Sequence, residues 1–327
     1  MRKIVLAGAD IIRFNFSYRN MEENNNIIQR GQKIIDELNA STKIFFDYPL
    51  KKIRLGDFNI KHFSVQENEE FIMQSGTFSL DCNQFIPVQI TKLGEKTRTN
   101  QIITIGDGEV ALQVVGIINS DTIKVRILNN GIIYFKKEFN LGYCRDKNYL
   151  LKEYKIINEQ TNLLEPDYVA IPYIEENFNE ELKKIFFQQN NRPELIIKIE
   201  QKISEESLIK ICNDKDYKML LIDRGEIGVN LPFEQVGLWQ KKICNIAKQY
   251  KKIIVVSTQI LESTMNYYIP HRSEILDLTN MILDGVNGIM LCHETGYGLR
   301  PAYSISVAKK IISEVENQIY EANKNKN

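Results

Sequence analysis

The fold of this chain is decided by three successive segments, KMLLID (218–223), FEQVGLWQKKICNIAKQY (233–250) and KKIIVVST (251–258). The first and third are short apolar runs rich in β-branched residues, which is typical of strands buried on both faces of a parallel sheet. In the second, apolar residues recur at helical spacing from Val236 to Ala247 and predict a helix with one apolar face. The three segments therefore indicate a strand–helix–strand unit.

The same alternation continues on both sides of these segments. Further strands are predicted at 167–174, 195–200 and 286–294, with amphipathic stretches between them. At least four such units in a row indicate either a doubly wound sheet or a (β/α)₈ barrel. Near the N-terminus the pattern adds a strand at 9–16, a helix over roughly 22–38 and a strand at 43–49.

The middle of the chain has a different pattern. Between about 58 and 143, short strand-like runs alternate with turn signals such as NNG (129–131), and no helical period appears. We therefore expect a barrel formed by residues 1–57 and 144–327, with an all-β domain inserted at 58–143.

Composition excludes several classes of protein. The 327 residues carry 42 basic and 42 acidic side chains, so neither a nucleic acid nor a membrane is expected as a partner. No apolar run approaches the roughly 18 residues of a membrane span, and no secretory leader is evident. The 5 cysteines are scattered, which favours reduced thiols and a cytoplasmic location.

Polar residues follow the predicted strands at their carboxyl ends, which form one mouth in a β/α barrel. Lys198 and Glu200 lie two residues apart and so face the same side of one strand. Mg²⁺ is usually held by one or two carboxylates together with substrate oxygens and water, so Glu200 and Glu226 are the expected ligands of Mg²⁺ or Mn²⁺. A solvent-exposed bend is the alternative interpretation of the charged, glycine-containing segment 223–228. The expected mouth contains Arg13, Asn15, Ser17, Asp47, Lys198, Glu200, Glu226, Thr258 and Glu294.

Several longer motifs resemble the pyruvate kinase family. They are RFNFS (13–17), IKIE (197–200), DRGEIGVNLP (223–232), STQILESTM (257–265), PHRSEILDLTNMILDG (270–285) and IMLCHETGYGLRP (289–301), with weaker matches at 107–108 and 136–142. The resemblance implies a (β/α)₈-type barrel, a β lid, and phosphoryl transfer between phosphoenolpyruvate and a nucleoside diphosphate.

The resemblance also assigns roles in the reaction. Lys198 matches the lysine that stabilises the transferring phosphoryl group and the enolate. Thr258 matches a threonine at the substrate carboxylate and the proton path, and Arg13 matches a phosphate-binding arginine. Glu200 and Glu226 match the metal ligands, although the family has aspartate at the position of Glu226.

Further matches concern cofactors. Arg54 matches a second phosphate-binding arginine, and Lys137 matches a lid lysine near the nucleotide. The family's potassium ligands are matched by Asn15, Ser17 and Asp47, whereas Tyr48 replaces the threonine of that set. Lys52 stands where potassium-dependent members have glutamate and potassium-independent members have lysine, so K⁺ is not expected to be required.

Two parts of the family's pattern have no clear counterpart in this sequence, namely the first barrel strand with its nucleotide-contacting loop and the C-terminal domain. A barrel without that strand would expose the edge of a neighbouring strand. We therefore expect residues 2–6 as a strand, a rearranged helix, or another copy of the chain to cover the gap.

The leading functional hypothesis is a diverged, metal-dependent enzyme acting on phosphoenolpyruvate, pyruvate or a related oxo-acid, with phosphoryl transfer as the reaction. A small anionic substrate is the expected partner, nucleotide is a possible cofactor, and self-association is left open. Two alternatives share the same residues: carbon–carbon bond lyase or aldolase chemistry through a metal-bound enolate, and a catalytically silent binding or scaffold protein.

Overall fold

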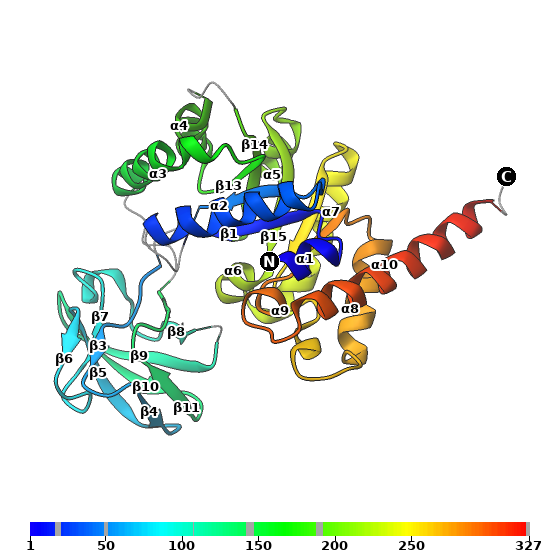
Figure 1. The fold of residues 1–327 in the computed structure, drawn as a ribbon. Coiled ribbons are helices and arrows are strands. Elements are labelled where there is room, and N and C mark those ends of the chain that lie inside the picture. The colour runs from blue at the N-terminus through cyan, green and yellow to red at the C-terminus, as the bar shows by residue number, and fades with distance from the viewer. Residues whose placement is uncertain (17–20, 49–51, 107, 142–146, 188–191, 325–327) are drawn as a thin grey trace. The chain divides into compact units, whose positions relative to one another are not determined.

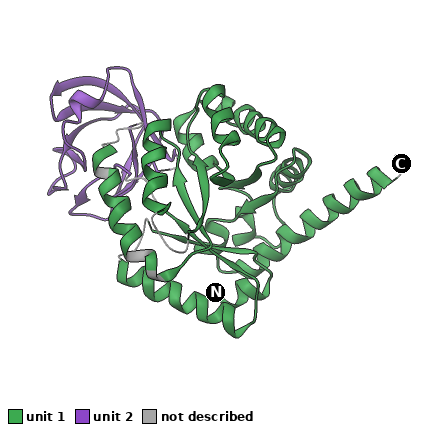
Figure 2. Ribbon diagram, turned by 90° about the horizontal axis from the view of Figure 1, so that it is seen from above, with its two compact units in different colours: residues 1–49, 147–327 green, residues 50–146 purple. Residues whose placement is uncertain are grey.

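The chain divides into two compact units, residues 1–49 with 147–327 and residues 50–146 (Figure 2). The computed structural model describes residues 1–16, 21–48, 52–106, 108–141, 147–187 and 192–324. The first domain boundary lies earlier than the sequence suggested, because Arg54 and Leu55 form backbone bridges to Glu138 and Val88 of the inserted unit. The second boundary falls at 146 instead of 143.

The larger unit contains a parallel sheet of seven strands, numbered as in Figure 1, and the inserted unit's strands intervene in the numbering. Ile11 of the first strand and Met290 of the last pack on the same interior cluster. Since neighbouring strands are about 4.8 Å apart, this contact requires the sheet to curl into a barrel wall. In order, the strands are β1 (Ile11–Asn15), β2 (Lys43–Asp47), β13 (Tyr168–Pro172), β14 (Glu194–Ile199), β15 (Tyr217–Asp223), β16 (Ile253–Ser257) and β17 (Gly288–Met290).

Helices follow the strands, as the alternating pattern predicted. In α7, the predicted apolar face is buried at Trp239, Ile243 and Ala247, which confirms the helical period. The helices of this unit are α1 (Arg2–Leu6), α2 (Met21–Glu37), α3 (Lys147–Thr161), α4 (Glu176–Phe187), α5 (Glu205–Asn213), α6 (Arg224–Asn230), α7 (Phe233–Gln249), α8 (Arg272–Leu283), α9 (His293–Gly296) and α10 (Pro301–Lys324), with 3₁₀ turns η2 (Asn162–Leu164) and η3 (Glu262–Met265).

The N-terminal residues form helix α1, one of the three expected arrangements. This helix contacts α2 and α10. The side chain of Met1 lies against Gly31 of α2, where a Cβ atom would come within 2.8 Å of the Met1 sulfur. Among the described residues, β1 pairs only with β2 and β17 only with β16, so the seven strands form a barrel wall with two free edges.

The inserted unit is all-β and has its own apolar core. Val114 and Val125, on neighbouring antiparallel strands, are fully buried within it. Its first and last segments lie side by side, since the Phe139 amide donates to the Ile53 carbonyl at 2.8 Å. The six-stranded sheet has the order β12 (Phe139–Asn140), β8 (Ile102–Ile105), β9 (Val110–Asn119), β10 (Thr122–Ile127), β5 (Glu70–Ser75), β7 (Ile86–Val88). Two small pairs, β11 (Gly131–Tyr134) with β4 (His62–Val65) and β3 (Asp57–Phe58) with β6 (Phe78–Ser79), and the turn η1 (Gly94–Lys96) complete it.

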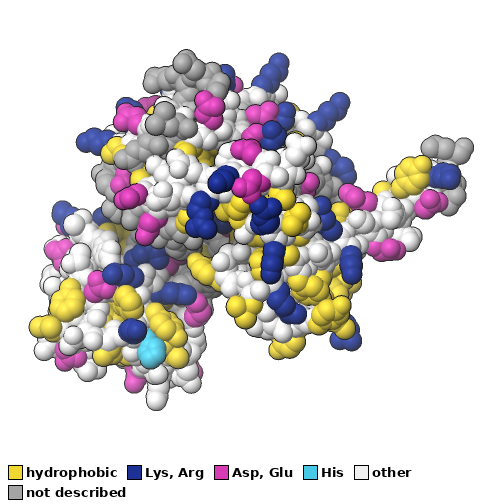
Figure 3. All heavy atoms as spheres, viewed as in Figure 1, with side chains coloured by type: hydrophobic (Ala, Val, Ile, Leu, Met, Phe, Trp, Pro, Cys, Tyr) yellow, Lys and Arg dark blue, Asp and Glu magenta, His cyan; other side chains and the backbone are white. Residues whose placement is uncertain are grey.

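Basic and acidic side chains are interspersed over the face drawn in Figure 3, which agrees with the zero net charge of the chain. None of the helices in the described part of the chain combines the length and apolar character needed to cross a membrane.

Candidate active site

The site lies at the carboxyl ends of the strands, next to the apolar cluster on the interior side of the sheet. Alternate residues of a strand face the same side. Ile196 belongs to the interior cluster, so Lys198 faces the same interior two residues later. Leu221 likewise places Asp223 on the interior side at the carboxyl end of its strand. The strand pairing also sets Asn15 opposite Asp47.

Four predicted side chains form one continuous chain of ion pairs. Arg13 binds one oxygen of Asp47, with its Nε at 2.7 Å and an Nη at 2.5 Å. Lys198 Nζ lies 3.0 Å from the other oxygen of Asp47 and 3.0 Å from Oε1 of Glu200, and it donates to the Tyr48 carbonyl at 3.1 Å. Lys198, Asp47 and Glu200 are all at least 95% buried, so their charges act through a medium of low polarity.

Burial and neighbouring charges have opposite effects on the pKa values of Lys198 and Asp47. Burial by itself would lower the pKa of Lys198, but Asp47 and Glu200 outweigh it and raise that pKa above its ordinary value. Burial would raise the pKa of Asp47, whereas Lys198 and Arg13 hold it below the ordinary range. Lys198 is therefore an ammonium and Asp47 a carboxylate at neutral pH. Lys198 can supply positive charge but cannot act as a base.

The charged segment after β15 is a short helix and not the glycine turn that the sequence suggested. Asp223 caps helix α6 by accepting from the Gly225 amide at 3.2 Å. Glu226 consequently lies in the first turn of this helix. The Asn230 side chain donates to the Glu226 carbonyl at 2.7 Å and to the Glu200 carbonyl at 3.4 Å. One amide group thus ties together the backbones of the two predicted metal ligands.

The chemistry of this donor set fits a hard divalent cation. Mg²⁺ commonly uses one or two carboxylates and completes its shell with water and substrate oxygens. Glu200 and Glu226 supply two carboxylates on neighbouring segments. Within the described ranges, no group of three or more His, Cys, Asp or Glu side chains is placed to hold a metal. Two carboxylates alone leave the coordination shell of the metal incomplete. The residues therefore fit a cation that also binds oxygens of the substrate and water.

Thr258 is held in an unusual backbone conformation. Its φ is +74° and that of Gln259 is +53°, although a β-branched residue rarely adopts positive φ. Arg224 donates to the Thr258 carbonyl from two nitrogens, at 3.0 and 2.7 Å, and to the Gln259 carbonyl at 2.8 Å. Such strain costs about 1–3 kcal/mol and persists where the surroundings over-determine it. The strain therefore points to a functional position for Thr258.

Cys292 and Glu294 line the remaining side of the mouth. Cys292 Sγ lies 3.8 Å from a guanidinium nitrogen of Arg13, and burial raises the pKa of its thiol to about 11. Glu294 is fully buried and accepts the amides of Leu261 at 2.9 Å and Cys292 at 2.8 Å. It thus joins the loops after β16 and β17. His293 pairs instead with Glu262, at 2.9 Å.

The other predicted residues belong to the inserted unit or lie outside the described residues. Lys137 pairs with Glu109 at 2.6 Å, Lys52 pairs with Glu138 at 2.5 Å, and Arg54 donates to the Lys136 carbonyl at 3.2 Å. These contacts are all within the inserted unit. Ser17 lies outside the described residues.

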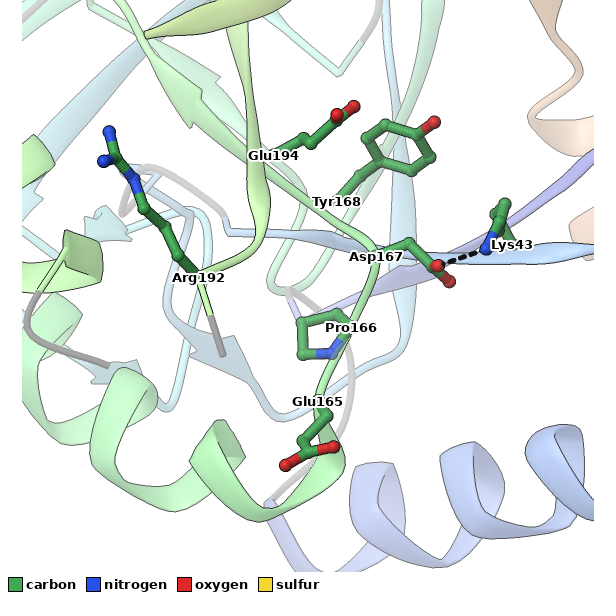
Figure 4. Close-up of a pocket in the computed structure, with 7 residues that line it drawn as sticks. All are labelled: Lys43, Glu165, Pro166, Asp167, Tyr168, Arg192 and Glu194. Atoms are coloured by element: carbon green, nitrogen blue, oxygen red, sulfur yellow. Dashed lines mark ion pairs between the residues drawn. The ribbon is translucent and has the colours of Figure 1, made fainter. Parts of the chain in front are cut away.

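A second hollow, of about 480 Å³, lies at the opposite ends of β2, β13 and β14 (Figure 4). Both of its basic side chains are paired: Lys43 binds Asp167 at 2.8 Å and Arg192 binds Asp216 at 2.8 Å. Asp167 also accepts the Ile44 amide at 2.8 Å, which fixes the start of β2. Because its ion pairs and hydrogen bonds hold strand ends together, we interpret this hollow as structural.

Comparison with known proteins identifies the family of this chain. Residues 1–305 match the family model described as "Pyruvate kinase, barrel domain". The chain belongs to the pyruvate kinase family. It is 26% identical to pyruvate kinase of Buchnera aphidicola subsp. Schizaphis graminum over 97% of this chain and 66% of that protein. It is 25% identical to pyruvate kinase of Thermotoga maritima over 98% of this chain and 68% of that protein.

Solved pyruvate kinase structures share the fold. A pyruvate kinase from Cryptosporidium parvum superposes with a TM-score of 0.85 at 22% identity, covering 96% of this chain and 67% of that one. The chain spans about two thirds of the length of the curated relatives it matches. The resemblance found in the motifs and the expected barrel with an inserted β unit are thus confirmed.

The sequence analysis assigned no role to two residues of this candidate site. Asp223 could have been found from the period of two, since Met219 and Leu221 precede it on the same side of β15. Asn230 gave no such signal, because its contact with Glu200 joins residues 30 positions apart.

Proposed function

We propose that the chain is a metal-dependent phosphotransferase acting on phosphoenolpyruvate, pyruvate or a related oxo-acid. The observation that carries the proposal is the buried ammonium of Lys198, held at 3.0 Å by both Asp47 and Glu200 at the carboxyl end of the wall. Membership of the pyruvate kinase family supports the same reaction.

In this mechanism, Lys198 is a fixed positive charge. It stabilises the negative charge that develops on an enolate oxygen or on a transferring phosphoryl group, and it needs no reorganisation to do so. Arg13 adds a second fixed charge beside it, positioned by Asp47. Thr258 orients the ligand at the far side of the mouth.

Glu200 and Glu226 would hold the divalent cation, Mg²⁺ or Mn²⁺, with Asn230 fixing the relative position of their backbones. When bound, the cation supplies Lewis-acid polarisation of substrate oxygens. Lys137 and Arg54 remain the proposed contacts for nucleotide and phosphate on the inserted unit.

A ligand screen tests the proposed function. In the presence of Mn²⁺, phosphoenolpyruvate or oxalate at 100 times its dissociation constant should raise the free energy of unfolding by about 2.7 kcal/mol. Stabilisation should require the metal, because the anion and the metal share the site. Transfer from phosphoenolpyruvate to a nucleoside diphosphate should then be measurable. Stabilisation without any transfer would favour the enolate lyase alternative, and no stabilisation by any oxo-acid would favour a silent binding protein.

Potassium independence is the expected behaviour of this enzyme. Asp47, a predicted potassium ligand, is already engaged by Arg13 and Lys198, so two cations already neutralise this carboxylate. Lys52 stays the proposed substitute for K⁺ on the ground of the sequence resemblance, and its ammonium pairs with Glu138 within the inserted unit. Replacing K⁺ by a large organic cation at constant ionic strength should change the transfer rate less than twofold.

The Lys52→Glu variant should acquire a potassium requirement, seen as a K⁺-dependent rise in rate. Lys136→Glu is the matched control, since Lys136 is also ion-paired within the inserted unit, to Asp57 at 3.1 Å. A strong K⁺ dependence of the unmodified protein would contradict the role of Lys52.

A further inference from the structure

The turn that follows β16 contains two strained residues in succession. Thr258 and Gln259 have positive φ, +74° and +53°, a region that residues other than glycine rarely adopt. The next two residues, Ile260 and Leu261, are fully buried, and the Leu261 amide donates to Glu294 at 2.9 Å. The strained pair is therefore anchored on its C-terminal side by buried contacts.

Arg224 holds the strained pair itself, and all three nitrogens of its guanidinium group are engaged by the protein. Nε and Nη2 donate to the Thr258 carbonyl at 3.0 and 2.7 Å, and Nη2 also donates to the Gln259 carbonyl at 2.8 Å. Nη1 pairs with Asp277 of α8 at 2.6 Å. Because its donors are used in this way and its side chain is only 15% exposed, Arg224 acts on the turn and not on a ligand.

These contacts connect the turn to the helix that carries a proposed metal ligand. Arg224 is the first residue of α6, and Glu226 follows two positions later. The side chain of Thr258 also packs closely on this helix, because a Cβ at Gly225 would lie 3.2 Å from its methyl carbon and 3.3 Å from its hydroxyl oxygen. The first turn of α6 thus fixes the position of Thr258 relative to Glu226.

We propose that Arg224 is a positioning residue, which holds the Thr258 hydroxyl at the ligand by binding the carbonyls of the two strained residues, with Asp277 orienting the guanidinium. Lysine could not replace it, because a lysine ammonium is a point charge and lacks the planar fork that reaches two carbonyls and a carboxylate at once. This inference rests on the proposed function, in which Thr258 orients an oxo-acid ligand. It adds a requirement for the shape of the side chain at position 224 that is separate from its charge.

A double-mutant cycle tests the proposal. Calorimetric titration in the presence of Mn²⁺ measures the affinity for oxalate of Arg224→Met, of Thr258→Val and of the double variant. Each single substitution should weaken oxalate binding about tenfold, as expected for the loss of one hydrogen bond to a charged group. If Arg224 acts through Thr258, the double variant should also lose only about tenfold, because the hydroxyl is already absent. Effects that multiply to about 100-fold would overturn the proposal.

Arg300→Met is the matched control. Arg300 also donates to two carbonyls of the loop after β16, those of Thr264 and Tyr267, each at 2.8 Å, but neither of these residues has positive φ. Its loss should lower the free energy of unfolding in urea, as the loss of Arg224 does, while leaving the affinity for oxalate unchanged. An equal loss of affinity in both arginine variants would show a general loosening of the loop and would overturn the positioning role.

Arg224→Lys separates shape from charge, and it replaces Arg224→Met in the cycle if that variant does not fold. It should weaken oxalate binding about as much as Arg224→Met does. Undiminished affinity in Arg224→Lys, or no binding of oxalate to the unmodified protein, would also overturn the proposal. Turnover of phosphoenolpyruvate decides the proposed function separately. Coupled oxalate binding without transfer would leave the role of Arg224 standing, and transfer with independent effects of the two substitutions would remove it.

Discussion

Replacing Lys198 by methionine is expected to reduce phosphoryl transfer by about 10³-fold, the upper end of the range for removal of one charge-stabilising donor. The ammonium lies 3.0 Å from a carboxylate oxygen of Asp47 and 3.0 Å from one of Glu200. Methionine fills a similar volume but leaves these two carboxylates to repel each other in a buried site. We therefore also expect a loss of about 3–5 kcal/mol in the free energy of unfolding, as is usual when one partner of a buried ion pair is removed.

Lys183→Met separates the two effects. Lys183 is equally buried, with a 6% exposed side chain, and it pairs with Glu180 and Asp214, each at 2.7 Å. Its loss should lower stability while leaving the affinity for oxalate with Mn²⁺ unchanged. Urea unfolding gives the stability and calorimetric titration gives the affinity. If Lys198→Met binds oxalate as tightly as Lys183→Met does, Lys198 does not contact the anion.

Replacing Glu226 by glutamine is expected to weaken Mn²⁺ binding at least about 100-fold. Even partners that only orient a metal ligand change affinity by 10- to 100-fold when removed, and a direct ligand should cost no less. The amide of glutamine keeps the size of the side chain and removes the charge. Titration of Mn²⁺, followed by calorimetry in the presence of oxalate, measures the effect.

Glu234→Gln is the control for this variant. Glu234 lies in the first turn of α7, as Glu226 does in α6, so both substitutions remove the same favourable interaction with a helix N-terminus. Only the Glu226 variant should lose metal affinity. Equal Mn²⁺ affinities in the two variants would remove Glu226 from the metal site.

Periodicity alone could predict the barrel wall, because its strands are buried on both faces and its helices on one. The buried Trp239 and Ile243 show why: their spacing is set by the helix itself. The alternation of side chains along a strand also predicted which candidate residues face the interior. Lys198 faces the same side as Ile196, two residues earlier on the strand.

What the sequence could not provide depends on contacts between distant residues. Glu226 was placed on a turn because glycines at 225 and 228 favour one, yet Asp223 caps a helix at the same place. The ion pair of Lys198 with Asp47 was likewise not predictable from local pattern, since Asp47 lies about 150 positions away in sequence. Local pattern predicts which face a side chain takes, whereas its ionisation depends on neighbours that only the fold brings close.

The side-by-side ends of the inserted unit bear on how the barrel folds. Strands β2 and β13 pair across an interval that contains the whole unit, residues 50–146. Closing a flexible loop of about 120 residues costs roughly 4 kcal/mol of chain entropy, against about 2 kcal/mol for a loop of ten. Because Arg54 and Glu138 bridge within the unit, its prior folding shortens the effective loop to about 35 residues, which lowers the closure cost to roughly 3 kcal/mol. Folding of the insert before β2 meets β13 therefore lowers the entropic barrier to closing the wall.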